Sequence, residues 1–455
     1  MNLCHFYPSL YWKCACLSVD AGAINEEDYY ELVDSGIVDL SDEDDVRAQN
    51  KVNYGKVASA IIKARETIGV ELPDINVSRL GFTPDEDRNV IVYGIRGIAR
   101  VGEQIIKDII INRPYNSLDD FIAKMVSADG KKLISKDKVV NLIKAGAFDN
   151  IENKPREEIL KNYILSVADQ KQKLNLQNFA MLIKQKMLPQ ELDFSVKVYN
   201  FTKYIRTMRY MGNYILDEFG YSFFSENYDL TKVNMIEKDG QYVNVISSAW
   251  WDNVYDAEMN KPRAYIKTHH DELLEELNTR LFNEEYNKYA NGGLLQWELD
   301  SLNFYYSGHP LQNLIIPTET TLVKDLKENE FDGFWMIKGK QVPKYKLRSI
   351  VGTVIDKDKV KGLVTLQTTD GVIDIKVFKQ QYARFDHTIT DVNENGDKII
   401  LEESFFEKGT HLLVTGILRG TTFTPKTYKD TGFDPILKIV TKEDGSLDYF
   451  IRKSE

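Results

Sequence analysis

Residues 93–113, YGIRGIARVGEQIIKDIIINR, constrain the fold more than any other stretch of the sequence. A β-branched run at 90–93 leads into a turn with glycines at Gly94, Gly97 and Gly102, and an amphipathic helix follows. The helix is predicted to place four isoleucines on one side and two cations away from it: Ile105, Ile106, Ile109 and Ile110, with Lys107 and Arg113. Glycines let backbone N–H groups approach a ligand closely, and the positive end of a helix dipole suits a phosphate. The pattern predicts a helix-hairpin-helix over 94–110 that grips a nucleic-acid backbone without reading its sequence; a helix–loop–helix capped by glycine is the alternative.

The composition is that of an ordinary globular protein, with 43% hydrophobic and 28% charged residues among 455. This length predicts about two to four domains. No apolar run is long enough to cross a membrane and no secretory signal opens the sequence, so we expect no membrane partner. The three cysteines, Cys4, Cys14 and Cys16, are too tightly spaced for a usual zinc pair, and His269 and His270 are adjacent. We therefore expect no metal site and a reduced, cytoplasmic setting.

The net charge of −11 is unevenly distributed. Eleven acidic residues and no Lys or Arg lie between Asp20 and Asp45, whereas Arg96–Lys173 holds 15 basic and 11 acidic residues. Because a phosphate-binding surface needs only a local positive potential, this distribution is compatible with a nucleic-acid partner. The acidic stretch is interpreted as a solvated loop, with a docking face for a basic partner as the alternative.

Helices are predicted on both sides of the hairpin motif. Residues 1–19 are apolar with helical spacing and should bury against something, and 53–68 is amphipathic. Ser117 is predicted to cap a short helix, SLDDFIAKM. A second basic helical stretch spans 131–149, with its apolar residues inward and its lysines, Lys136, Lys138 and Lys144, outward. Residues 151–300 are expected to be mostly helical and contain no motif that carries chemistry.

From Lys346 the apolar period changes to that of β-strands. Four alternating segments are separated by Gly, Asp and Lys turns, and a helical piece, QQYARF, and a polar hairpin at about 388–400 lie between the third and fourth. This order is typical of an OB-fold, a small barrel whose exposed face and loops often bind single strands; an inert packing module is the alternative. The candidate contacts are Arg348, Lys357, Lys359, Lys361, Lys376, Phe378 and Arg419.

These pieces, in this order, resemble the C-terminal half of the bacterial replicative DNA polymerase III alpha subunit, a member of polymerase family C. The matching strings are HFYP at 5–8, LPDIN at 72–76, YGIRGIARVGEQII at 93–106, INRPYNSLDDF at 111–121, LIKAGAFD at 142–149, YYSGHPL at 305–311 and the barrel. Each string alone is a modest signal, but their collinear order over roughly 420 residues is specific.

The resemblance implies an α+β multidomain chain, in which a mostly helical fingers remainder and a hairpin region precede a β-barrel OB-fold. The implied regions are 1–89, the last part of the fingers; 90–150, a tandem helix-hairpin-helix that holds duplex DNA; 151–345, a helical region with a clamp-binding motif; 346–424, the OB-fold near the single-stranded template; and 425–455, a tail. The DNA-contacting residues would be Gly94, Gly97, Arg100, Val101, Gly102, Lys107, Arg113, Lys136 and Lys138.

One departure from the family concerns the hairpin turn, which is usually Gly-Val-Gly but here is Arg100-Val101-Gly102. Losing the first glycine removes freedom for positive φ, although Arg100 could add a phosphate contact. The family also carries a pentapeptide, a Gln followed by apolar and aromatic residues, that enters a pocket of the sliding clamp. Two candidates occur: QNFAM with Gln177 and Met181, and QELDF with Gln190 and Phe194. Plain helix surface or core is the alternative for both.

Family C polymerases hold two divalent metals on palm aspartates, and the signature is a strand with Asp-x-Asp after Pro-Asp plus a third Asp. We find no such strand, and the six scattered histidines could not rebuild the family's N-terminal domain. No catalytic residue and no cofactor are therefore expected on this chain. The implied arrangement is a split polymerase, as in a viral or rearranged genome, in which a second chain supplies the palm, thumb, N-terminal domain and Mg²⁺.

Other classes of function stay open at this stage. A free-standing, non-catalytic accessory protein derived from such a polymerase would bind DNA or the clamp without a stoichiometric large partner. A nuclease or ligase built from the same modules would need a carboxylate or lysine nucleophile motif, which we do not find. Co-purification with a large polymerase chain separates the first alternative from the split polymerase.

Overall fold

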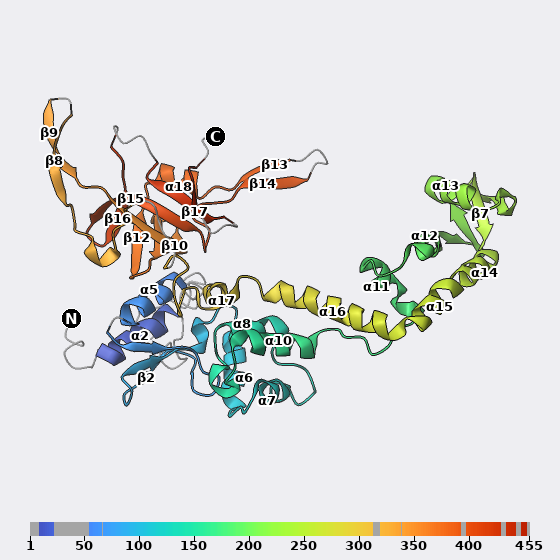
Figure 1. Ribbon diagram of the computed structural model, residues 1–455, viewed down its shortest axis with the longest axis horizontal. Coiled ribbons are helices and arrows are strands. Elements are labelled where there is room, and N and C mark those ends of the chain that lie inside the picture. Colours follow the sequence, from blue (N-terminus) through green and yellow to red (C-terminus); the bar gives the residue numbers. More distant parts are fainter. Residues whose placement is uncertain are drawn as a thin grey trace. The chain divides into compact units, whose positions relative to one another are not determined.

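The computed structural model describes residues 9–21, 54–65, 67–312, 319–337, 339–392, 397–428, 434–442 and 447–452 (Figure 1). The chain divides into two compact units, one formed by Met1–Leu160 with Ala290–Glu455 and the other by Lys161–Tyr289. The string HFYP at 5–8 and nearly all of the acidic stretch from Asp20 to Asp45 lie outside the described residues.

The first unit begins with two helices packed on a small sheet. Helix α2 (Ser9–Asp20) contacts α5 (Tyr54–Arg65), and the sheet has the order β1-β3-β2, formed by β1 (Gly69–Glu71), β2 (Thr83–Asp85) and β3 (Val90–Val92). The amphipathic helix predicted at 53–68 is confirmed by α5, where Val57 and Ile61 are fully buried. Leu10, Cys14 and Leu17 of α2 are also buried. These three side chains are covered by the chain itself, whereas Trp12 on the same helix is 46% exposed.

The hairpin region follows β3. It contains one 3-10 turn and five helices: η1 (Ile95–Gly97), α6 (Glu103–Ile111), α7 (Leu118–Lys124), α8 (Lys136–Lys144), α9 (Asp149–Glu152) and α10 (Arg156–Val167). The predicted cap is confirmed, because the Ser117 hydroxyl accepts from the Asp120 amide at 3.1 Å. The first helix of the first hairpin is reduced to the single turn η1. Two predicted orientations were wrong. Ile110, which was expected on the apolar side of its helix, is exposed, and Lys144, which was expected to face outward, is buried.

The barrel is confirmed as an OB-fold, and the α+β fold class with it. Its strands are β10 (Arg348–Asp358), β11 (Leu363–Gln367), β12 (Val372–Lys376), β15 (His411–Arg419) and β16 (Thr422–Pro425). They pair in the order β10-β11-β12-β16-β15, and the pairing of β10 with β15 closes the barrel. Strands β12 and β16 are parallel, and the other pairs are antiparallel. Helix α18 (Lys379–Phe385), the predicted QQYARF piece, buries Tyr382 and Phe385 in the barrel core.

Additional β-structure flanks the barrel. Strands β13 (Ile389–Val392) and β14 (Lys398–Glu402) form the predicted hairpin insertion, and β17 (Ile436–Thr441) and β18 (Leu447–Phe450) continue the sheet past residue 424. A second hairpin precedes the barrel, made of β8 (Phe331–Ile337) and β9 (Lys340–Tyr345), with the turn η6 (Val323–Asp325) before it. This hairpin lies within 151–345, where we expected a helical region.

The second unit is more mixed than the helical region that we expected. Its helical elements are η2 (Leu176–Asn178), α11 (Phe179–Lys184), η3 (Gln190–Leu192), α12 (Asp193–Ile205), η4 (Arg206–Met208), α13 (Glu218–Asn227), η5 (Leu230–Lys232), α14 (Ser248–Glu258), α15 (Asn260–Thr268) and α16 (His270–Tyr289). A sheet of order β4-β5-β7-β6 lies among them, formed by β4 (Arg209–Tyr210), β5 (Asn213–Leu216), β6 (Val233–Lys238) and β7 (Gln241–Ser247).

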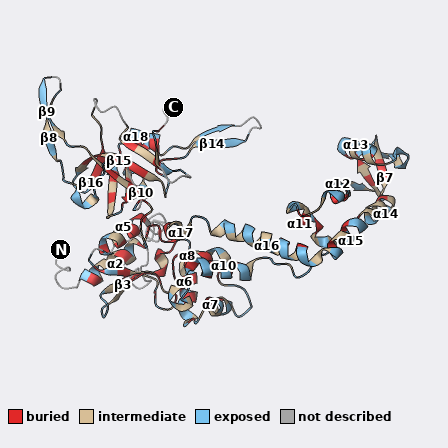
Figure 2. Cartoon of the chain, viewed as in Figure 1, coloured by how far each residue is buried: buried red, intermediate tan, exposed pale blue. Residues whose placement is uncertain are grey.

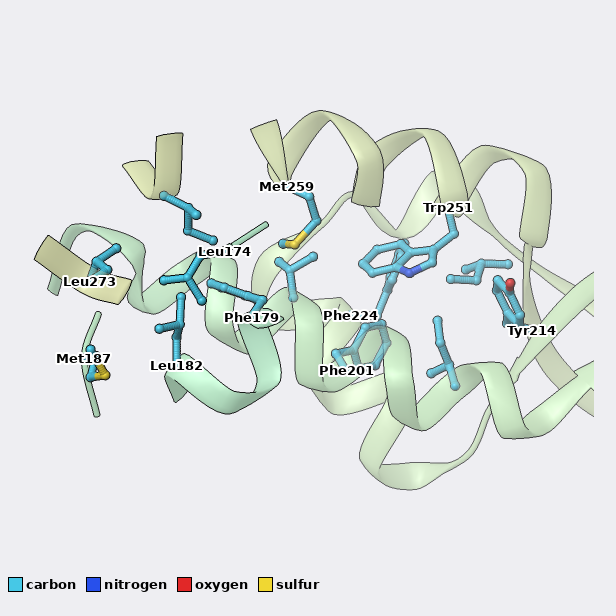
Figure 3. Packing of buried hydrophobic residues seen from close by; sticks show 14 of the residues in the cluster. Leu174, Phe179, Leu182, Met187, Phe201, Tyr214, Phe224, Trp251, Met259 and Leu273 are labelled. Carbon is cyan, nitrogen blue, oxygen red and sulfur yellow. The ribbon is translucent and has the colours of Figure 1, made fainter. Parts of the chain in front are cut away.

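Aromatic side chains build the core of this second unit (Figure 3). Trp251 is fully buried beside Phe201 and Phe224, and its indole N–H donates to the Thr202 hydroxyl at 3.0 Å. Trp250 packs against the same cluster, so the interpretation of Trp250 and Trp251 as core residues is confirmed. After this unit the chain returns to the first one through α17 (Gly293–Leu302). None of the helices in the described ranges is both long and apolar enough to cross a membrane.

Candidate nucleic-acid interface

The first hairpin turn keeps the backbone geometry that a glycine would give. Arg100, which replaces the family's first glycine, has φ = +67° and an exposed side chain. Val101 is buried, and its amide donates to Ile98 O at 3.4 Å. A non-glycine residue in the left-handed region costs on the order of 1 kcal/mol. The chain therefore tolerates backbone strain at the one position of the turn that presents a guanidinium to solvent.

The glycines before this turn serve packing. A Cβ on Gly94 would collide with the backbone of 81–82, and a Cβ on Gly97 would collide with the Tyr93 ring. The neighbouring amides are already used, because Ile95 donates to Arg79 O at 2.9 Å and Arg96 donates to Leu80 O at 3.1 Å. Gly94 therefore lets η1 approach the 81–82 backbone, Gly97 leaves room for the Tyr93 ring, and the amides of Ile95 and Arg96 are bonded within the chain.

The start of α6 is the open part of the motif. Gly102 is its N-cap with φ = −79°, and within the described residues no side chain caps this helix and nothing lies within 4 Å of a Cβ built on Gly102. The first-turn amides of an α-helix have no partner inside the helix, and the dipole makes this end positive. Lys107 pairs with Glu103 at 3.1 Å one turn further on. The helix start, together with Arg100, is suited to a phosphate.

Two further cations lie near Arg100. Loss of solvation in the surrounding protein lowers the pKa of Lys144 and lowers the pKa of Lys408 to about 8. The positive charge of Arg100 adds a smaller lowering effect on the pKa of each lysine. The side chain of Lys408 still reaches solvent. Asp300 of α17 opposes them, with its Oδ2 3.9 Å from Lys144 Nζ. Asp356 also acts on Lys408, so three cations face two carboxylates, and the junction keeps a net positive charge.

The hairpin is fixed to its surroundings by backbone contacts. Ala99 N donates to Ser301 O of α17 at 2.8 Å, and the Asn141 side chain of α8 donates to Ala99 O at 2.9 Å. Lys408, which precedes β15, donates to the Asn303 carboxamide. The barrel and the hairpin region therefore both contribute to the cation cluster, which we define as Arg100, Lys144 and Lys408. Lys408 was missed because it lies more than 300 residues away in sequence.

The second hairpin, at 145–147, is built differently. Gly146 has φ = +87°, and a Cβ there would collide with the Arg156 guanidinium. Arg156 is itself buried and pairs with Asp149 at 2.8 Å and Glu298 at 3.4 Å. Glu298 is fully buried and accepts from the backbone amides of 306 and 307 at 2.8 and 2.9 Å. Lys136 and Lys138 lie in the first turn of α8 and are partly exposed.

Arg113 makes structural contacts that its position in the sequence does not predict. Its guanidinium donates to the backbone carbonyls of Ile75, at 2.7 Å, and of Ser78. Burial lowers the pKa of this side chain. Arg113 therefore holds the 75–78 loop, and we do not retain it as a phosphate contact.

On the barrel, most of the predicted contacts are already paired. Arg348 forms a bidentate ion pair with Glu330 at 2.8–2.9 Å. Lys357 pairs with Asp386 at 2.7 Å, and Lys361 pairs with Asp358 at 3.4 Å. Lys376 donates to the Lys361 carbonyl. Lys359 lies in the β10–β11 loop, Phe378 precedes α18 and Arg419 ends β15; all three are exposed. The structure thus leaves these three as the more accessible of the predicted contacts.

The two clamp-motif candidates fold differently. In QNFAM, Gln177 is exposed, but Phe179 is fully buried and Met181 packs partly against the core of the second unit. In QELDF, Gln190 is exposed at the start of η3 and Phe194 is 38% exposed, while Leu192 is buried. Only the second string offers both its Gln and its aromatic ring at the surface.

Acidic residues of the described part do not gather into a metal site: no group of three His, Cys, Asp or Glu side chains there has the spacing to hold an ion. After β2, Arg88 pairs with Asp85 and Glu71, each at 2.7 Å, on the surface of the protein. The cluster Asp42–Asp45 lies outside the described residues.

Comparisons with known proteins agree with this geometry. A family model described as "Helix-hairpin-helix motif" matches residues 67–158, which contain both hairpins. The chain is 33% identical over 472 aligned residues to "Probable DNA polymerase YorL" of Bacillus subtilis (strain 168) and equally to a "DNA-directed DNA polymerase" of Bacillus phage SPbeta. Each alignment covers 100% of this chain but 34% of the relative. The "DNA polymerase III subunit alpha" of Aquifex aeolicus (strain VF5) is 38% identical over 107 residues, 22% of this chain and 9% of the relative.

The chain is thus similar to DNA polymerases, and it carries a helix-hairpin-helix motif and an OB-fold barrel. More closely, the chain corresponds to a C-terminal piece of a DNA polymerase III α-like protein, so the resemblance seen in the sequence is confirmed. The chain spans about a third of the length of the polymerases that it matches over its whole length.

Proposed function

We propose that this chain is a DNA-holding part of a replicative polymerase and that its first hairpin grips the backbone of the primer–template duplex. The observation that supports this most is the position of Arg100, which directly precedes the uncapped start of α6 and is close enough to Lys408 for their charges to interact. Lys144 is buried, so it adds positive potential without direct contact. The contact is to phosphate, and we expect affinity to depend on salt and not on sequence.

A salt titration of duplex binding tests this proposal. Fluorescence anisotropy of a labelled primed duplex should give a log–log salt slope that becomes less negative by about one unit for each phosphate contact removed. We expect Lys408→Gln to reduce that slope, and we expect the wild-type affinity to fall between pH 7 and 9 as Lys408 loses its proton. The Lys408→Gln variant should lack this pH-dependent component. An unchanged slope and an unchanged pH profile would remove Lys408 from the DNA path.

For the barrel, we propose contact with the single-stranded template through Lys359, Phe378 and Arg419. Lys359 and Arg419 lie in or beside the two loops that commonly hold oligonucleotides in this fold, and Phe378 is an exposed aromatic ring. Substituting Phe378 by Ser should weaken binding of a single-stranded oligonucleotide without affecting duplex binding. Equal affinity of the two proteins for the single strand would leave the barrel as a packing module.

We further propose that the chain tethers a sliding clamp through QELDF at 190–194. The exposure of Gln190 and Phe194 supports this choice, since binding through QNFAM would require Phe179 to leave the core. Gln190→Ala should lower clamp-stimulated processivity, whereas Gln177→Ala should not. The reverse result would assign the tether to QNFAM.

Chemistry is proposed to come from a second polymerase chain that carries the palm, thumb and N-terminal domain and that holds the Mg²⁺. The identity of the relatives as DNA polymerases supports this proposal. With magnesium, nucleotides and a primed strand, we expect the chain alone to extend nothing and the co-purified pair to extend the primer. A chain that binds DNA but never co-purifies with a polymerase partner would instead support a free-standing accessory protein.

A further inference from the structure

The β8–β9 hairpin exposes aromatic side chains that the barrel does not cover. Phe331 and Phe334 are 59% and 58% exposed, with ring centroids 5.0 Å apart, and Met336 on the same strand is more exposed still. Figure 2 shows this hairpin as one of the exposed parts of the first unit. Neighbouring exposed rings are unusual on a soluble surface and mark a place where something binds.

The opposite face of the hairpin is anchored. Trp335 lies 5.2 Å from the Tyr428 ring, and Lys344 Nζ lies 5.1 Å from the Trp335 centroid and 5.7 Å from that of Tyr428. The Tyr428 hydroxyl accepts from the Tyr345 amide at 2.8 Å and donates to the Tyr345 carbonyl at 2.7 Å. The exposed rings therefore sit on a fixed ribbon, so little ordering is needed when a ligand binds.

The base of the hairpin lies beside the β15–β16 turn of the barrel. Glu328 forms a parallel bridge with Leu418 and accepts from the Gly420 amide at 3.0 Å, and Asn329 N donates to Leu418 O. Arg419 ends β15 at this turn, and the loop between these two strands is one of the two that hold oligonucleotides in OB-folds. The hairpin therefore continues a surface that the fold already directs toward nucleic acid.

Charge distinguishes this hairpin from the other one on the barrel. Residues 331–346 hold four lysines and one aspartate, and Lys340 and Lys346 are exposed. Residues 387–403, which contain the β13–β14 hairpin, hold five acidic residues and one lysine, and their exposed apolar side chains are aliphatic: Val392, Ile399, Ile400 and Leu401. Aromatic rings among lysines are the composition that stacks bases and neutralises phosphates, whereas the acidic hairpin would repel a phosphate backbone.

We propose that the β8–β9 hairpin is a stacking platform for single-stranded nucleic acid, with bases on Phe331 and Phe334 and phosphates at the exposed Lys340 and Lys346. This inference rests on the proposed strand-binding role of the barrel and extends it to a segment outside the five barrel strands. The binding has no base-edge readout, so it should accept any sequence of adequate length.

Anisotropy with fluorescent oligo-dT and the full chain tests the proposal. Phe331→Ser/Phe334→Ser should weaken binding at least tenfold, because base–aromatic stacking is worth about 1–3 kcal/mol per base. Phe334→Trp should retain wild-type affinity. The matched control is Val392→Ser/Ile400→Ser on the β13–β14 hairpin, with comparable exposure and no expected loss.

Two results overturn the inference. If the Phe331→Ser/Phe334→Ser variant and the wild type bind oligo-dT equally, the hairpin is not a stacking platform. If the wild-type chain binds primed duplex but no oligo-dT at all, the stacking platform is ruled out and the proposed duplex grip survives. If the wild-type chain binds neither ligand, the stacking platform and the duplex grip are both overturned. A photocrosslink from 5-iodouracil in the oligonucleotide should fall within 331–346 and be lost in the double variant, and crosslinks confined to 389–402 would contradict the proposal.

Discussion

The two helical hairpins have similar glycine-containing turns but opposite surroundings. In the first, the left-handed residue is the exposed Arg100 and the following helix starts uncapped. In the second, the left-handed residue is Gly146, which is covered by the buried Arg156 and its ion pairs with Asp149 and Glu298. The comparison teaches that a repeated motif does not imply a repeated function: one hairpin is open to a ligand, and the other holds α9, α10 and α17 together.

The largest expected effect is on the second hairpin. Glu298→Ala leaves Arg156 without a fully buried partner and removes the acceptor of two backbone amides, so we expect unfolding free energy to fall by about 3–5 kcal/mol. Calorimetry of the first unit's transition measures this. Glu298→Gln keeps an acceptor and should lose clearly less. A neutral Glu298→Ala would show that the ion pairs do not hold this hairpin.

The next effect contrasts the two turns through their glycines. Gly146→Ala combines strain at φ = +87° with a collision against Arg156, and should destabilise by about 2–3 kcal/mol. Gly102→Ala, at φ = −79° in open space, should stay within about 0.5 kcal/mol of wild type. Equal losses, measured by thermal unfolding, would remove the difference in surroundings that separates the two hairpins.

A smaller and more specific effect is expected at Arg100. Arg100→Gly relieves the left-handed strain, so stability should rise by about 1 kcal/mol, while duplex affinity should fall by about threefold to tenfold as a phosphate contact is lost. Arg100→Ala is the control: it should lose the same affinity without the gain in stability. A rise in stability together with a fall in duplex affinity cannot come from misfolding. An Arg100→Gly protein that binds duplex normally would contradict the assignment of Arg100 as a phosphate contact.

The smallest effect is expected from the lysines at the start of α8. Lys136→Gln/Lys138→Gln should change the duplex salt slope by less than the pair Arg100→Ala/Lys408→Gln, because the second hairpin lies against its own chain. Both slopes come from the same anisotropy titration. A larger change from the α8 pair would reverse the comparison and assign the duplex to the second hairpin.

Patterns that are local in sequence predicted the fold well. The OB-fold order followed from strand period and the position of QQYARF, and the caps and amphipathic faces of α5 and α7 followed from helical spacing. The sheet at 209–247 was missed because its short strands are embedded in helical sequence, and the β8–β9 hairpin was missed because few of its residues alternate between buried and exposed.

The candidate site was predicted only in part, because its key contacts join distant segments. Lys144 has the spacing of an outward residue, yet it is buried near Asp300 of a helix that lies more than 150 residues away in sequence. Arg113 has the spacing of a surface cation, yet it binds backbone carbonyls of the 75–78 loop. Periodicity assigns a face to a residue, but it does not say which other segment covers that face.

Hydrogen–deuterium exchange on the full chain, with and without a primed duplex, tests the central claim most directly. We predict that DNA slows exchange of the amides at 102–105, which open α6, and leaves the amides at 145–148 unchanged. Slower exchange at 145–148 without any change at 102–105 would contradict the account.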